Sequence, residues 1–340
     1  MCSETTKRLV TQLGVHEEFI DSIELNKPWR IEPPSFTGFS PFTITLIDAN
    51  HCPGSVAVIV RGVGFAYFVS GDIRVSCEVL RIAKTLGPTS YDVGFLDSTF
   101  YDSSGKWDVM PTIGQSISAL VTFLKSNSMN CAFEFDLLGT EVLIEAVLDA
   151  FPKEKIAVTD GNRYDELITV FSTDRKTVSR LIHLEIEDSP WRFAIISRST
   201  SIPPNFMKLR ASTQRWAGHI RRSSTDGTTF PLIEVCEQRN EAFLFFSFHS
   251  CKKEIDWLIR ELNIKEWRPL VPAIEVDHPK PIELPSEPSE KPRRKRCMRR
   301  PFDFTTDGMW LATITDSQET VMVSSKYSDD DVILPTWRNL

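Results

Sequence analysis

The chain has 340 residues, of which 41% are hydrophobic and 25% are charged. These fractions are typical of a folded globular protein, and the length allows two domains or one domain with a sizeable insertion. The sequence has no run of about 18 apolar residues and no basic-then-apolar signal pattern at its start, so neither a membrane span nor a signal peptide is expected. The seven cysteines form no Cys-x-x-Cys pair. This argues against a zinc finger or a disulfide framework and favours a reducing compartment.

The formal net charge of −7 disfavours a nucleic-acid partner, but the charge is unevenly distributed. Residues 205–222 and residues 291–300 each contain several Lys and Arg residues and no Asp or Glu. Local basic stripes determine the affinity for phosphate more than the total charge does. These two segments therefore keep a nucleic-acid partner open.

Short apolar runs dominate the first hundred residues. β-Branched and aromatic residues predict strands at 42–47, 56–60, 65–69 and 93–96, with a glycine-containing hairpin turn between the second and the third. Helical spacing of apolar residues predicts a helix at 77–86.

Helix and strand patterns alternate from residue 110 onward, which indicates an α/β unit with a parallel sheet. Helices are predicted at 113–124, 139–151 and 255–262, and strands at 131–135, 156–158, 181–184 and 243–246. After about residue 276, prolines alternate with charged residues, a composition typical of an extended linker. The last forty residues are acidic and show little periodicity.

Polar residues that could bind a metal follow several of these strands. His51, Asp72 and Asp97 each come directly after an apolar strand, and His183 and His249 lie in or after later ones. Ligands gathered at strand ends are how α/β folds build sites, and a hydrolytic zinc centre needs imidazole and carboxylate groups on such rigid supports. The same residues also fit structural roles, such as a hydrogen-bonded histidine, a simple Gly-Asp turn or a helix cap at Asp97. Spacing alone leaves both interpretations open.

Four motifs in this region share a resemblance. They are Asp-Ala-Asn-His-Cys-Pro-Gly-Ser at 48–55, Ser-Gly-Asp-Ile-Arg at 70–74, Leu-Asp-Ser-Thr-Phe at 96–100 and Phe-Ser-Phe-His-Ser at 246–250. Their order and spacing resemble the DNA cross-link-repair branch of the metallo-β-lactamase nucleases, which carry a β-CASP insertion. Residues 1–7 and 172–183 also resemble segments of that family.

The resemblance covers about residues 1–275 and implies the fold. We expect an α/β protein with a metallo-β-lactamase αββα sandwich, N-terminally incomplete, at residues 1–110 and 240–275. A β-CASP α/β domain is expected as an insertion at 111–239. Residues 276–340 are expected to form a low-order tail with a basic tract.

The resemblance also implies roles for individual residues. His51, Asp72 and His249 would be zinc ligands, with Asp72 bridging the ions if two are bound. Asp97, His183 and His249 would be the β-CASP motif residues, and Asp97 would support the metal site from behind the ligands. Asp72, Asp97 and His249 would be the catalytic residues.

The implied function is zinc-dependent hydrolysis of DNA phosphodiesters, by 5′ exonuclease or structure-specific endonuclease action. The context would be repair of double-strand breaks or interstrand cross-links. The cofactor would be one or two Zn²⁺ ions, and the partners would be DNA ends, overhangs or cross-linked strands together with repair proteins, without a membrane.

The two basic segments fit this function. The first would bind DNA through its cations and stack unpaired bases on its aromatic side chains; the expected contacts are Lys208, Arg210, Arg215, Trp216, Arg221 and Arg222. The second resembles a nuclear localisation signal at Arg293, Arg294, Lys295 and Arg296, so a nuclear location is expected. A solvated loop and a generic basic tract are the alternatives for the two segments.

One departure from the family pattern bears on the metal site. The family's His-x-His-x-Asp-His motif, which supplies most ligands of its two-metal site, does not occur in this sequence. Zinc binding by this chain is therefore expected to be weak or absent. The chain could be a piece of an active nuclease, or a truncated and catalytically inactive paralogue that binds DNA or protein. Glu185 stands where some relatives have a cysteine that binds a separate zinc ion, so that site is not expected.

Overall fold

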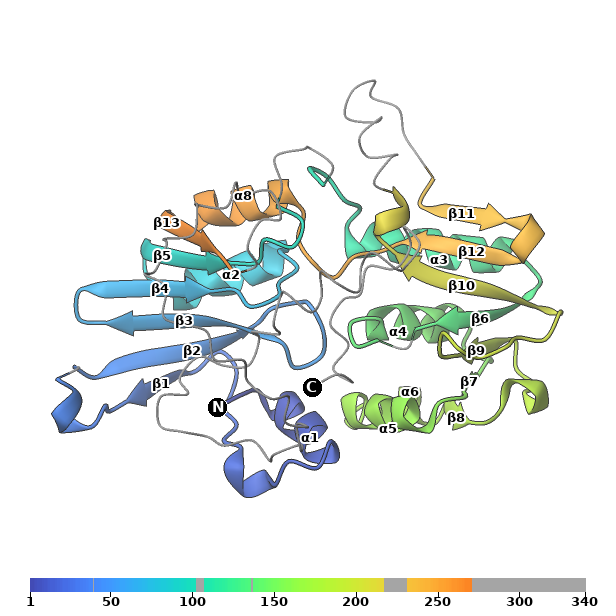
Figure 1. The fold of residues 1–340 in the computed structure, drawn as a ribbon, viewed down its shortest axis with the longest axis horizontal. Coiled ribbons are helices and arrows are strands. Elements are labelled where there is room, and N and C mark those ends of the chain that lie inside the picture. The colour runs from blue at the N-terminus through green and yellow to red at the C-terminus, as the bar shows by residue number, and fades with distance from the viewer. Residues whose placement is uncertain (39, 102–106, 136, 217–230, 271–340) are drawn as a thin grey trace, which may run out of the picture. The chain divides into compact units, whose positions relative to one another are not determined.

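The structure is a computed structural model that describes residues 1–38, 40–101, 107–135, 137–216 and 231–270 (Figure 1). Two β-sheets organise these residues, one of six strands and one of seven. None of the helices in the described ranges is both long and apolar enough to cross a membrane.

The first sheet has the strand order β1-β2-β3-β4-β5-β13. Its strands are β1 (Pro28–Ile31), β2 (Phe42–Asp48), β3 (Val56–Gly62), β4 (Phe65–Val69), β5 (Tyr91–Leu96) and β13 (Ile264–Pro269). Strands β1 to β4 pair antiparallel in chain order, whereas β5 pairs parallel with both β4 and β13. Parallel neighbours need crossover connections, and the helices α2 (Cys77–Leu86) and α8 (Lys252–Glu261) lie in them.

A hydrophobic core joins this sheet to α2 and α8. Val79, Leu80 and Ala83 recur on one face of α2 and are buried against Ile59 and Phe68 of the sheet, together with apolar residues of α8. This spacing is the helical period that the sequence shows. The side chain of Ser76 caps α2, since its Oγ accepts the Val79 N–H at 3.2 Å.

The second sheet has the strand order β11-β12-β10-β6-β9-β7-β8. Its strands are β6 (Asn130–Glu134), β7 (Ile156–Val158), β8 (Leu181–His183), β9 (Phe193–Ile195), β10 (Phe206–Ser212), β11 (Ile233–Cys236) and β12 (Glu241–Phe245). All neighbours pair parallel except β11 and β12. The predicted parallel α/β unit is therefore confirmed.

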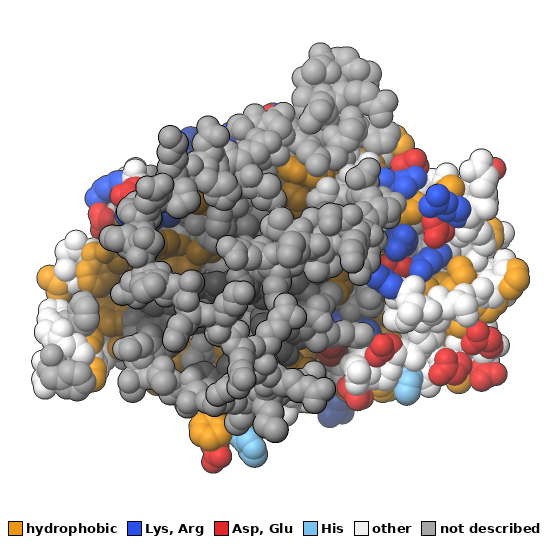
Figure 2. Space-filling model, viewed as in Figure 1, with side chains coloured by type: hydrophobic (Ala, Val, Ile, Leu, Met, Phe, Trp, Pro, Cys, Tyr) orange, Lys and Arg blue, Asp and Glu red, His pale blue; other side chains and the backbone are white. Residues whose placement is uncertain are grey.

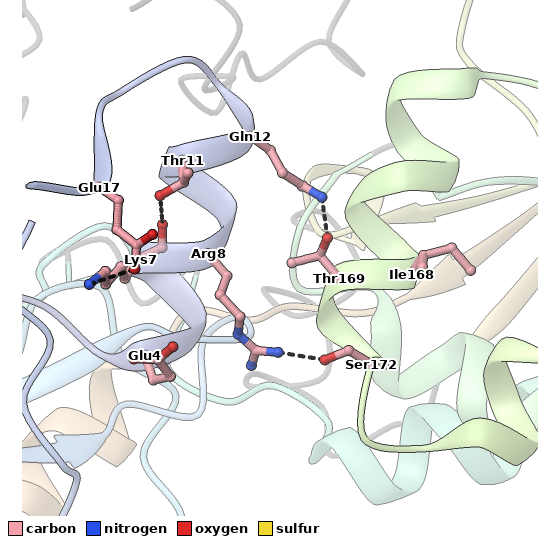
Figure 3. A pocket seen from close by; sticks show the side chains of 9 residues that line it. All are labelled: Glu4, Lys7, Arg8, Thr11, Gln12, Glu17, Ile168, Thr169 and Ser172. Atoms are coloured by element: carbon pink, nitrogen blue, oxygen red, sulfur yellow. Dashed lines mark hydrogen bonds and ion pairs between the residues drawn. The ribbon is translucent and has the colours of Figure 1, made fainter.

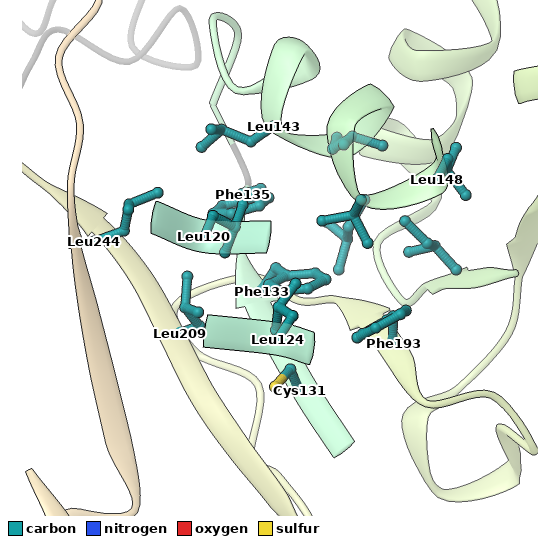
Figure 4. Packing of buried hydrophobic residues seen from close by; sticks show 14 of the residues in the cluster. Leu120, Leu124, Cys131, Phe133, Phe135, Leu143, Leu148, Phe193, Leu209 and Leu244 are labelled. Carbon is teal, nitrogen blue, oxygen red and sulfur yellow. The ribbon is translucent and has the colours of Figure 1, made fainter. Parts of the chain in front are cut away.

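Helices pack on this second sheet and bury its largest apolar cluster. They are α3 (Ile113–Ser126), α4 (Glu141–Ala150), α5 (Gly161–Val170) and α6 (Arg175–Val178). Leu120 and Leu124 of α3 and Leu143 of α4 lie against Phe133 and Phe135, whose rings stack with centroids 4.9 Å apart (Figure 4). Continuous apolar strands of this kind are expected where a parallel sheet is buried.

The remaining elements are short. Helix α1 (Glu4–Gln12) begins the chain. The 3-10 helices are η1 (Glu17–Phe19), η2 (Ser35–Thr37), η3 (Ile186–Asp188), η4 (Gln214–Trp216) and η5 (Glu237–Arg239).

The predicted domain boundary at residue 240 does not coincide with the point where the chain leaves the second sheet. Strand β12 was assigned to the first domain as part of residues 240–275, but it pairs with β10 and β11 in the second sheet. The chain returns to the first sheet only after Phe245. The apolar run at 243–246 predicted a strand correctly, but a run of this kind carries no information about which sheet it joins. Outside the seven-stranded α/β sheet, the described residues form one six-stranded sheet, from β1 to β5 together with β13, so the second sheet of an αββα sandwich is not among them.

The first core gives a direct stability prediction. Phe68 has 0% of its surface exposed, so Phe68→Ala should lower the free energy of unfolding by about 3–5 kcal/mol through lost burial and a residual cavity. Val63, at 85% exposure in the β3–β4 turn, is the control, and Val63→Ala should change it by less than about 0.5 kcal/mol. Urea unfolding measures both, and equal effects would contradict the assigned core.

Candidate metal centre

The loop between β2 and β3 that carries His51 is shaped by a Pro-Gly turn. The N–H of Ser55 donates to the carbonyl of Cys52 at 3.0 Å and closes the turn. Gly54 has a φ of +88°, the left-handed value that the third position of a type II turn requires and that glycine adopts readily. Asn50, just before His51, is also left-handed at φ +54°, which asparagine tolerates. The loop therefore has a defined backbone that fixes the position of His51.

The ring of His51 is oriented by a backbone carbonyl. Its Nδ1 lies 3.0 Å from the carbonyl oxygen of Phe248, 197 residues away in sequence. Since a carbonyl can only accept, Nδ1 carries the proton, and Nε2 keeps its lone pair. That Nε2 lies 3.7 Å from Oδ2 of Asp72. The ring is thus held in the tautomer that a metal ligand needs.

His249 is oriented in the same way by Asp97. Its Nδ1 lies 2.8 Å from Oδ2 of Asp97, and both side chains are buried. Asp97 also accepts the backbone N–H of Ile73 at 3.2 Å and that of Thr99 at 2.9 Å. A carboxylate that is fixed by backbone donors and binds Nδ1 leaves Nε2 of the histidine free for a cation.

Three potential ligands converge from these loops. One atom from each of His51, Asp72 and His249 lies within 4.8 Å of the others, and the two imidazole centroids are 4.6 Å apart. Zinc bonds of 2.0–2.2 Å would place neighbouring tetrahedral ligands about 3.4 Å apart. The side chain of Asp72 is 47% exposed, so it can rotate to close the remaining distance. Two imidazoles and one carboxylate, with solvent access on the Asp72 side, fit a divalent metal ion such as zinc.

Burial and neighbouring charges set the protonation of this cluster. Burial, assisted by nearby His249, lowers the pKa of His51, so its ring stays neutral. For His249, burial acts to lower the pKa, but the Asp97 carboxylate outweighs it and the pKa is raised. For Asp97, burial acts to raise the pKa, but His249 and Thr99 outweigh it and the pKa is lowered. Burial raises the pKa of Cys52 to about 12, so it remains a thiol rather than a thiolate ligand.

Arg74 is a residue of this site that the sequence analysis did not single out. Its buried guanidinium donates to the carbonyls of Ser247 at 3.2 Å, His249 at 2.8 Å and Pro111 at 2.7 Å, and it lies 3.1 Å from Glu254. These contacts fix the backbone that carries His249. Arg74 ends the Ser-Gly-Asp-Ile-Arg motif, which was the available signal, but nothing local in the sequence identifies partners so far along the chain.

His183 does not join the other candidate residues. It ends β8, is exposed, and stacks on Tyr164 of α5 with ring centroids 5.6 Å apart. Among the described residues, the cluster able to hold a metal consists of His51, Asp72 and His249. His183 was predicted as a β-CASP motif residue and not as a metal ligand, so its motif role stays a prediction.

Three of the basic residues predicted to bind DNA form ion pairs in the structure. Lys208 and Arg210 of β10 pair with Glu134 at 2.7 and 3.1 Å, and Arg215 pairs with Glu234 at 2.9 Å.

Trp216 corrects the prediction of a stacking surface. It is 1% exposed, stacks on Phe245 with centroids 5.2 Å apart, and donates its indole N–H to the Pro231 carbonyl at 2.8 Å. Phe206 is also buried, at 2% exposure. In a sequence, an aromatic residue beside basic residues suggests a nucleic-acid-binding surface. In the structure, however, the hydrophobic effect has placed both of these rings in the interior.

Several predicted residues lie outside the described residues. They are Arg221, Arg222, Arg293, Arg294, Lys295 and Arg296, together with the whole predicted tail at 276–340.

The chain is 24% identical to human Artemis over 277 residues, which cover 75% of this chain and 38% of Artemis. The chain resembles Artemis and Apollo. Its identity to the rat 5′ exonuclease Apollo is 34% over 147 residues, covering 42% of this chain and 26% of Apollo. DNA ligase 6 from Arabidopsis thaliana is 28% identical over 176 residues, covering 50% of this chain and 11% of the ligase.

These matches confirm the family resemblance that the motifs predicted. The chain matches 38% or less of the length of each of these three relatives. No protein-family model matches it. Among solved structures, a protein of unknown function from Enterococcus faecalis V583 superimposes with a TM-score of 0.50 at 12% identity, covering 79% of this chain and 68% of that one. This likeness supports the α/β fold alone.

The buried Asp97–His249 pair predicts a pH dependence of stability in the metal-free chain. Because the pKa of His249 is raised in the folded chain, His249 contributes fully to the stability of the fold below pH 6.5, the ordinary pKa of histidine. This contribution is lost as the pH rises through the pKa of His249 in the folded chain. Because the pKa of Asp97 is lowered in the folded chain, Asp97 contributes fully to the stability of the fold above pH 3.8, the ordinary pKa of aspartate. This contribution is lost as the pH falls through the pKa of Asp97 in the folded chain. The Asp97–His249 pair therefore stabilises the folded chain most between pH 3.8 and pH 6.5.

Asp97→Asn isolates this contribution. In the presence of a chelator, the loss of unfolding free energy caused by Asp97→Asn should be larger at pH 5.5 than at pH 9, as measured by urea unfolding. A loss of the same size at both pH values would rule out a charged pair.

Proposed function

We propose that this chain carries part of the active site of a zinc-dependent DNA nuclease of the metallo-β-lactamase/β-CASP type. The reaction would be 5′ exonuclease or structure-specific endonuclease cleavage in the repair of double-strand breaks or interstrand cross-links. The observation that carries the proposal is the convergence of His51, Asp72 and His249, with both imidazoles held through Nδ1. The similarity to Apollo, which is named a 5′ exonuclease, supports a nucleic-acid substrate.

The protein groups have distinct roles in this proposal. His51, Asp72 and His249 would hold the metal. A zinc ion bound there would supply a hydroxide near neutral pH and neutralise charge on the scissile phosphate. Asp97 would keep the Nε2 of His249 directed at the ion, and the exposed side of Asp72 would admit the phosphate and water.

The basic residues of β10 would contribute to DNA binding. Arg198, Lys208 and Arg210 surround the single carboxylate of Glu134 at 3.3, 2.7 and 3.1 Å. Lys208 and Arg210 alone outnumber this one carboxylate, and such an excess of positive charge attracts a phosphate backbone. Figure 2 shows Lys and Arg side chains gathered on the right side of the view, with acidic side chains among them.

The finer features of the proposal follow from the same resemblance. The six-stranded sheet would be one layer of an αββα sandwich, and the second sheet with its helices would be the β-CASP domain. One or two zinc ions would be bound in the complete site. The basic tract at residues 293–296 would direct the protein to the nucleus, and repair proteins would be its partners.

A second candidate function is a catalytically inactive module that binds DNA or protein. The observation that favours it is the small ligand set: three ligands gather among the described residues, and the sequence lacks the His-x-His-x-Asp-His motif. A site with few ligands binds zinc weakly, because each missing ligand removes a bond and constrains the others less.

Nuclease activity tests the proposal. The full chain should degrade 5′-labelled DNA with single-stranded overhangs in a zinc-dependent reaction. Asp72→Asn should lower the rate by at least about 100-fold, since residues that only support metal ligands are already worth roughly 10- to 100-fold. The matched control is Asp149→Asn, an exposed carboxylate on α4 paired with Lys176, which should leave the rate unchanged.

The outcomes separate the two functions. Zinc-dependent cleavage that Asp72→Asn abolishes supports the nuclease. DNA binding without cleavage at any zinc concentration would favour the inactive module. Turnover of a small ester or lactam without nuclease activity would indicate a small-molecule hydrolase instead.

The basic cluster makes a prediction about salt. Arg210→Ala should weaken DNA binding about equally for all sequences and reduce the slope of log affinity against log salt by about 1, as expected for one lost phosphate contact. Glu134 keeps Lys208 and Arg198 as partners, so the sheet should stay folded. Fluorescence anisotropy across a salt series measures the slope. Arg260→Ala is the control, because the Arg260 side chain is exposed on α8, and an equal effect there would exclude a specific role for the cluster.

A further inference from the structure

Two hydroxyls from the start of the chain hold the loop that carries His51. Ser3 is buried and caps α1, since its Oγ accepts the N–H of Thr6 at 3.1 Å. The Oγ of Ser3 and the Oγ1 of Thr6 also lie 2.7 and 2.8 Å from the carbonyl oxygen of Gly54 and donate to it. One carbonyl of the β2–β3 loop is therefore bound by two side chains of α1 and its cap.

The close approach depends on glycine at position 54. A Cβ there would lie 2.8 Å from Oγ1 and 2.9 Å from the backbone N of Thr6, and 3.1 Å from the Oγ of Ser3. Distances below 3 Å require something to move. Gly54 thus meets two requirements, since the turn needs its positive φ and α1 needs its bare backbone.

The contact is transmitted to His51 through the turn. The Oγ of Ser55 accepts the N–H of Cys52 at 3.1 Å and donates to the Cys52 carbonyl at 2.7 Å. These bonds, with the backbone bond that closes the turn, make Cys52 to Ser55 a rigid unit directly after His51. Fixing the Gly54 carbonyl therefore limits how the His51 backbone can move.

The far side of α1 is anchored on the second sheet's helices. Arg8 donates to the hydroxyl of Ser172, just after α5, and Gln12 donates to that of Thr169, in the last turn of α5 (Figure 3). Leu9, on the same helix, is buried. Helix α1 therefore connects α5 to the turn after His51 and has contacts on both sides that resist its displacement.

We propose that Ser3 and Thr6 are positioning residues for the metal centre, which hold the His51 turn through the Gly54 carbonyl. This inference rests on the proposed metal-dependent function and adds two residues that would not touch the metal. Hydroxyls at these positions keep His51 at the distance from Asp72 and His249 at which one ion can be shared. Without them the turn keeps its own hydrogen bonds but loses its attachment to α1.

The test compares zinc affinity in the full chain with and without the hydroxyls. Ser3→Ala combined with Thr6→Val should weaken zinc binding by about 10-fold or more, the range seen when groups that support a ligand are removed. Competition titration with a chromophoric chelator measures the affinity. A second double variant, Ser3→Ala with Thr6→Ser, keeps a hydroxyl at position 6. It should recover part of the zinc affinity that Ser3→Ala with Thr6→Val loses. Thr11→Val is the matched control, because Thr11 is exposed on α1 and its hydroxyl donates to the carbonyl of Lys7 within the same helix. The zinc affinity of this variant should be that of the wild-type chain.

A second readout does not depend on metal. In the metal-free double variant, the amides of Cys52 and Ser55 should exchange with solvent at least about 10-fold faster than in the wild-type chain, because the turn opens more often. Wild-type affinity retained by the double variant, or unchanged exchange of these amides, would overturn the positioning role. A wild-type chain that binds no zinc would contradict the proposed metal centre itself, and the exchange measurement would still decide whether α1 restrains the turn.

Discussion

The buried hydrogen bond between Asp97 and His249 joins parts of the chain that are 152 residues apart. Asp97 follows β5 of the first sheet, and His249 follows β12 of the second. The bond is made inside the protein, where an unpaired carboxylate would be strongly unfavourable, so both segments must meet for either to be stable. The same bond fixes which nitrogen of His249 faces Asp72 and His51. One interaction therefore serves both the folding of the chain and the chemistry of the candidate site.

Other long-range contacts support this geometry. Arg74 donates to the carbonyls of Ser247 and His249, and the carbonyl of Phe248 between them orients the ring of His51. The loop before α4 also packs closely, since a Cβ on Gly139 would lie 3.1 Å from the His51 carbonyl oxygen. The strands supply rigid ends, and these contacts determine where the side chains on those ends point. Asp72 alone remains half exposed, which gives the site its side open to solvent.

Much of the fold could be predicted from sequence because its strands are short, apolar and bounded by turn residues. The runs at 65–69 and 156–158 correspond to β4 and β7 as the structure has them, and the helical spacing at 77–86 to α2. The site residues His51, Asp72 and His249 could be proposed because they follow such runs. Arg74 and Ser3 could not, because their roles depend on contacts with distant residues. Trp216 was predicted wrongly, since its basic neighbours suggested a surface that tertiary packing has buried.

The central claim is that Nε2 of His51, Nε2 of His249 and a carboxylate oxygen of Asp72 bind one metal ion. Anomalous diffraction at the zinc absorption edge, from crystals of the full chain grown with zinc, tests it most directly. The account predicts one strong peak about 2.0–2.2 Å from these three atoms, with each Nδ1 still bound to its partner. A peak at Nδ1 of either histidine, or a zinc-soaked crystal with no peak among the three side chains, would contradict it.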